Sequence, residues 1–60
     1  MSMLTELFGP AAILMGLNEV KEKIKALPPS LREKKSYLLK EYEAITGIEV
    51  VSKDYNDVGA

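Results

Sequence analysis

Two consecutive prolines, Pro28 and Pro29, constrain this chain more than any other feature of its sequence. Proline lacks a backbone N–H and disfavours helical geometry in the residue before it, so a helix that reaches this point must end near Leu27. The segment from Ser30 to Glu33 then matches the S-x-x-E capping box that begins many helices. Short connections of this kind usually join antiparallel neighbours, so the sequence predicts an all-α fold built on a two-helix antiparallel hairpin.

The predicted first helix runs from Pro10 to Leu27, with proline in its first turn. Its apolar residues follow the a/d heptad spacing that is typical of a coiled coil; they are Ile13, Leu17, Val20, Ile24 and Leu27. Before this helix, apolar residues at helical spacing predict a short helical segment that the Ser2 hydroxyl would cap. A single kinked helix over residues 2–27 is the alternative.

The predicted second helix runs from Leu31 to Thr46. Gly47 follows it and would supply the left-handed residue that commonly closes a helix. The apolar stripe of this helix is interrupted by lysine, and it contains Leu31, Leu38, Tyr42 and Ile45.

The segment after Gly47 differs from the helical part of the chain. Ile48–Val51 favours a strand, but a strand this short needs a partner strand for its backbone groups. Ser52–Ala60 is mostly polar, with Tyr55 as its only large aromatic side chain. We therefore expect a helical hairpin over residues 1–47 and an extended tail over residues 48–60, which would become ordered only against a partner.

Small size limits how this chain can be stabilised. It has 60 residues, no cysteine and no histidine. A chain of this length has a marginal core and usually adds disulfides, a metal or a partner. Disulfides and the ordinary zinc and copper sites need cysteine or histidine, so close helix packing and association with another chain remain.

Two packed helices would leave much apolar surface uncovered, and such surface usually marks an interface. The sequence therefore predicts a small non-enzymatic structural or interaction module that assembles with itself or as an accessory subunit of a larger complex. In the alternative, the N-terminal segment covers the open face of the hairpin. Ile48–Val51 would add a strand to a partner's sheet edge. The predicted partner-interface residues are Leu4, Leu7, Phe8, Ile13, Leu14, Leu17, Ile48 and Val50.

Positive charge gathers around the prolines, although the whole chain has a formal charge of −1. Between Val20 and Lys40 the acidic residues are Glu22 and Glu33, whereas the basic ones are Lys21, Lys23, Lys25, Arg32, Lys34, Lys35 and Lys40. An alternative function follows, in which a small regulator binds nucleic acid or an acidic protein surface at this basic tip. The residues expected to contact a polyanion are Lys25, Arg32, Lys34 and Lys35.

The remaining side chains predict no catalytic, cofactor-binding or metal-binding residues. Without histidine, cysteine or a glycine-rich phosphate loop, the chain lacks the usual motifs of enzymes. Its most apolar run, Leu7–Leu17, is shorter than the roughly 20 residues of a membrane span. Membrane contact is therefore the least supported form of association. The absence of cysteine and of a secretory signal favours a cytoplasmic location.

Overall fold

Short helices joined by brief non-helical segments make up the structure. The computed structural model describes residues 2–59 and contains no strand within them, which confirms the all-α expectation. The elements are α1 (Met3–Phe8), the 3₁₀-helix η1 (Pro10–Leu14), α2 (Leu17–Lys25), α3 (Pro29–Arg32), α4 (Lys35–Thr46) and α5 (Ser52–Asp57). Residues 1 and 60, the outer ends of the two predicted segments, lie outside the described part.

Two breaks divide residues 2–27: one precedes the helix that was predicted from Pro10 to Leu27, and one lies within it. The helix before it is confirmed as a separate element, because the Thr5 N–H donates to the Ser2 hydroxyl at 3.2 Å and α1 ends at Gly9, which has a φ of +87°. After η1, the backbone is extended at Met15 and Gly16. The predicted continuous helix is therefore wrong, and glycine, a poor residue for a helix interior, stands at the second break.

A third break lies after the two prolines. The Pro28 carbonyl accepts from the N–H groups of Leu31 and Arg32, so α3 already begins at Pro29. The predicted capping box is wrong because Ser30 lies inside this first turn. The chain leaves the helix again at Lys34 before α4 begins. The predicted helix from Leu31 to Thr46 is thus two helices, and the hairpin of two long helices is not confirmed.

Gly47 ends α4 as expected, with φ +77° and ψ 2° and an N–H that donates to the Glu43 carbonyl at 2.8 Å. The segment Ile48–Val51 that follows is neither helix nor strand. The extended tail predicted beyond it is wrong, because residues 52–57 form α5. The Asp54 carboxylate accepts from the Val51 N–H at 2.9 Å and so satisfies a donor at the start of that helix.

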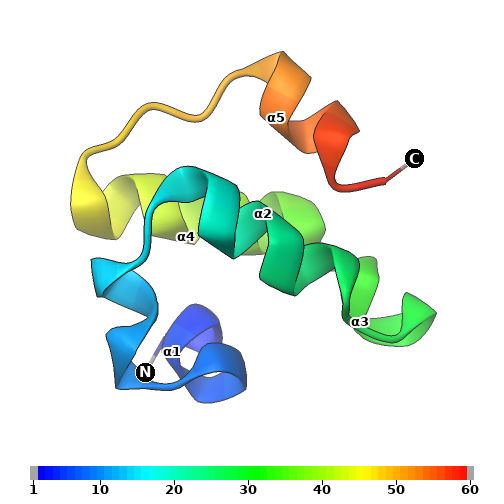
Figure 1. Ribbon diagram of the computed structural model, residues 1–60, viewed down its shortest axis with the longest axis horizontal. Coiled ribbons are helices and arrows are strands. Elements are labelled where there is room, and N and C mark those ends of the chain that lie inside the picture. The colour runs from blue at the N-terminus through cyan, green and yellow to red at the C-terminus, as the bar shows by residue number, and fades with distance from the viewer. Residues whose placement is uncertain (1, 60) are drawn as a thin grey trace.

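Helix α4 lies at the centre of the arrangement. It contacts α1, η1 and α5, and Figure 1 shows α1 and α5 on opposite sides of it. The radius of gyration is 10.2 Å, close to the value of about 10 Å expected for a compact domain of this length. The core consists of Leu4, Ala12, Val20, Ile24, Leu38, Leu39, Tyr42, Val50 and Val58, and Tyr55 of α5 packs against it.

The breaks explain why two of the stripe residues are exposed. Val20 and Ile24 lie within α2, and both are fully buried. Ile13 precedes the break at Met15–Gly16, so it no longer shares their helical phase and is 41% exposed. In the second stripe Leu31 precedes a break in the same way and is also exposed. Because α4, the longest helix described, has 12 residues, no helix has the three or more heptads of a coiled coil, and that expectation is not supported.

Replacing Gly47 with Ala is expected to lower the free energy of unfolding by about 1–2 kcal/mol, because an L-residue resists the left-handed region. An added Cβ would meet no atom within 4 Å, so the cost is confined to the backbone. Gly16→Ala is the matched control, because its Cβ is equally free but φ is −72°. Gly16 is the N-cap of α2, where alanine is a poorer residue than glycine. This cost offsets the gain of about 0.4–1 kcal/mol from a less flexible unfolded chain, so the control is expected to be close to neutral. Urea unfolding followed by circular dichroism measures both, and equal effects would contradict the assignment.

Candidate functional site

Most of the predicted interface residues pack within the fold of the chain itself. Leu4 is fully buried, and its N–H donates to Glu41 Oε1 at 2.8 Å. Leu7, Phe8 and Leu17 are partly buried against the core, and Val50 belongs to it. The N-terminal segment therefore covers its own hydrophobic core, which was the alternative to an interface. These side chains are not available as a bare surface for a partner.

The other predicted interface residues remain exposed and lie at one end of the molecule. Leu14 is 84% exposed, and Ile13 and Ile48 are 41% and 43% exposed. Ile45 of α4, at 45%, was not among the predicted interface residues. We call these four residues (Ile13, Leu14, Ile45 and Ile48) the apolar patch.

A hydrogen bond brings together the two segments that carry the apolar patch. The Tyr42 hydroxyl donates to the Met15 carbonyl at 2.6 Å and joins α4 to the residue that follows Leu14. Ile45 lies almost one turn after Tyr42 on the same helix. Figure 1 shows η1 and the C-terminal end of α4 at the same side of the molecule. Burial raises the pKa of Tyr42, and the nearby Glu19 carboxylate raises it further, so the hydroxyl stays a donor at neutral pH.

The segments that carry the apolar patch are acidic. Residues 2–20 and 41–52 contain no lysine and no arginine, and their charged residues are Glu6, Glu19, Glu41, Glu43 and Glu49. Glu41 and Glu43 are used internally, because they accept from the N–H groups of Leu4 and Val50. Of the others, Glu49 directly follows Ile48, and Glu19 lies close enough to Tyr42 to raise its pKa. We call these two exposed carboxylates the acidic rim of the patch.

An ionic cluster fastens α5 to α2. Lys21 Nζ lies 2.8 Å from Asp54 Oδ1 and 3.0 Å from Asp57 Oδ2, and the Lys21 and Asp54 side chains are only 10% and 11% exposed. Hydrogen bonding to Asp54 raises the pKa of Lys21, and hydrogen bonding from Lys21 lowers the pKa of both aspartates. A lysine used as a base or nucleophile needs a lowered pKa. This cluster is therefore suited to holding the fold together.

Sequence reasoning missed this cluster. The three-residue spacing of Asp54 and Asp57 would place both carboxylates on one face of a helix, and this was the available signal. The spacing does not identify Lys21, which lies 33 positions before Asp54. Within residues 2–59, no group of three or more acidic, cysteine or histidine side chains is placed to hold a metal ion.

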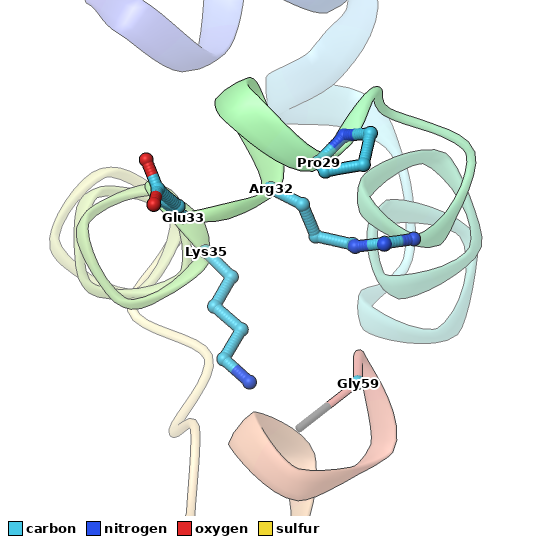
Figure 2. Close-up of a pocket in the computed structure, with 5 residues that line it drawn as sticks. All are labelled: Pro29, Arg32, Glu33, Lys35 and Gly59. Carbon is cyan, nitrogen blue, oxygen red and sulfur yellow. The ribbon is translucent and has the colours of Figure 1, made fainter.

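The basic tip contains a shallow pocket of about 320 Å³ that is lined by Pro29, Arg32, Glu33, Lys35 and Gly59 (Figure 2). We call it the basic pocket. Of the predicted polyanion contacts, Arg32 and Lys35 therefore come together here. Lys34 is exposed at the start of α4 and does not line the pocket. Lys25 does not line it either, and its ammonium pairs with Glu22 at 2.9 Å.

We compared the chain with known proteins. No protein-family profile, curated protein or solved structure matches the chain. Among the helices described, none is both long enough and apolar enough to cross a membrane.

Proposed function

We propose that this chain is a small non-enzymatic interaction module that docks through the apolar patch onto a partner protein. The observation that carries the proposal is the exposure of Leu14, which is 84% exposed although nine other apolar side chains of the chain are buried in its core. Ile13, Ile45 and Ile48 of the apolar patch are also exposed. Burying a leucine side chain contributes about 1.5–3 kcal/mol, so a partner that covers this patch gains substantial binding free energy.

The charge around the apolar patch favours a partner of a different kind over a second copy. A symmetric dimer would bring its own acidic rim, Glu19 and Glu49, against itself, and like charges in contact oppose association. The partner we propose has an apolar contact face with lysine or arginine around it. An amphipathic helix with a leucine stripe and basic flanks has this chemistry.

A synthetic peptide with that pattern tests the proposal. We expect saturable binding by fluorescence anisotropy, with NMR shifts concentrated at residues 13–15 and 45–48. Leu14→Glu is expected to weaken binding by about ten- to a hundredfold, because it removes a buried leucine and adds like charge to the rim. Tyr37→Glu is the matched control, because Tyr37 is also an exposed apolar residue but lies at the opposite end of α4.

Three outcomes would contradict this function. The peptide with glutamate in place of its lysines could bind equally well, which would remove the charge argument. Leu14→Glu could leave the affinity unchanged, which would remove the patch. Sedimentation could show a stable dimer of the chain that Leu14→Glu dissociates, which would assign the patch to a second copy.

A further inference from the structure

The basic pocket has a feature that the proposed docking function does not use. Its two cations, Arg32 and Lys35, come from different helices and border one space, with Gly59 at its edge (Figure 2). A volume of about 320 Å³ lies at the lower limit of small-molecule sites. Both side chains are partly buried, so part of each is already withdrawn from solvent.

Arg32 makes one long hydrogen bond, and most of its donors stay available. Its Nη1 donates to the Lys25 carbonyl at 3.4 Å, at the end of α2. A Cβ on Gly59 would lie 4.0 Å from Arg32 Cδ, so the C-terminal segment passes close to the arginine stem. A guanidinium has five N–H donors in a rigid fork, and only one of them has a partner among residues 2–59.

The positive charge of the basic pocket is uncompensated in the part of the chain that the structure describes. Arg32, Lys34 and Lys35 form no ion pair with any described residue. Glu33 lines the pocket, but Figure 2 shows its carboxylate directed away from the space between Arg32 and Lys35. Two cations facing one hollow repel each other, and an anion between them relieves that repulsion.

We propose that the basic pocket binds the phosphoryl group of a small phosphorylated molecule. The Arg32 fork suits two oxygens of a phosphate, and Lys35 supplies a second charge from another side. A phosphate monoester carries up to two negative charges near neutral pH and matches the two cations, whereas a carboxylate carries one. This site lies at the basic tip and does not depend on the apolar patch.

The test is an NMR titration of the chain with inorganic phosphate and pyrophosphate, with sodium chloride added to keep the ionic strength constant. We expect saturable shifts at Arg32, Lys35 and Gly59, and weaker binding of acetate. Arg32→Gln and Lys35→Gln are each expected to weaken phosphate binding about tenfold or more. Lys23→Gln is the matched control, because it removes one exposed charge of α2 outside the basic pocket.

Circular dichroism of each variant first establishes that its helicity is unchanged. The proposal is overturned if the shifts do not saturate, or if they spread equally over Lys23, Lys40 and Lys53. It is also overturned if acetate binds as tightly as phosphate, or if Arg32→Gln and Lys23→Gln bind phosphate equally well. None of these results tests the apolar patch, so failure of this proposal is distinguishable from failure of the proposed function.

Discussion

Replacing Leu4 with Ala is expected to lower the free energy of unfolding by about 2–5 kcal/mol. The side chain is fully buried, and its helix packs against both η1 and α4. A chain of 60 residues has a total stability of only about 3–9 kcal/mol. The single substitution therefore removes a large fraction of the total stability.

Leu14→Ala is the matched control for Leu4→Ala, since it makes the same chemical change at a site that is 84% exposed. We expect it to change stability by no more than about 0.5 kcal/mol. Urea unfolding followed by circular dichroism measures both variants. If Leu4→Ala were as mild as Leu14→Ala, α1 would not be part of the core, and the N-terminal segment would again be a candidate interface.

The second large effect concerns the ionic cluster. Lys21→Met keeps the length and most of the apolar stem of the side chain but leaves Asp54 without its ammonium partner, and an unpaired buried charge is costly. We expect amide hydrogens of residues 52–57 to exchange much faster with solvent, while those of α4 keep their protection. Asp54→Asn is expected to act in the same direction, because Asp54 also accepts from the Val51 N–H.

Lys53→Gln is the control for the ionic cluster. Its ammonium lies 3.5 Å from Asp57, but the side chain is 81% exposed. Exposed pairs contribute little, so exchange within α5 should remain close to that of the wild-type chain. Equal exchange in Lys21→Met and Lys53→Gln would show that the buried cluster does not hold α5.

The same cluster predicts how the attachment of α5 depends on pH. Lys21 lowers the pKa of Asp54 and Asp57 from their ordinary 3.8, so their contribution is present above pH 3.8 and is lost as the pH falls through the lowered values. Hydrogen bonding to Asp54 raises the pKa of Lys21 from 10.5. The contribution of Lys21 to stability is therefore present below pH 10.5 and is lost as the pH rises through the raised value. Protection of α5 should therefore be constant near neutral pH and fall at both extremes, and this dependence should be reduced in Lys21→Met.

Local signals in the sequence identified several element ends correctly. The Ser2 cap, the end of α1 before Pro10 and the left-handed Gly47 all depend on the chemistry of a few adjacent residues. The proline pair also ended a helix, although α2 stops two residues before Leu27. The sequence analysis assumed that each of the two long helices runs without a break, and this assumption was wrong. Breaks at Gly16 and Lys34 changed which side chains face the core.

The candidate sites were also predicted only in part from the sequence. The basic tip was visible as a cluster of charges along the sequence, but only the structure separates Arg32 and Lys35, which share a pocket, from Lys25, which pairs with Glu22. The apolar patch was predicted in part, through Ile13, Leu14 and Ile48. Leu4 was assigned to an interface because sequence alone does not show whether a chain covers its own hydrophobic surface.

The sequence by itself determined that this chain is helical, lacks disulfides and the usual zinc or copper ligands, and turns at its prolines, because these properties depend on composition and near neighbours. Only the tertiary structure decided that α1 and α5 complete the core around α4. Lys21 meets Asp54 across 33 positions and Leu4 meets Glu41 across 37. Contacts at such separations depend on how all the helices pack together, and this packing leaves the apolar patch exposed and forms the basic pocket.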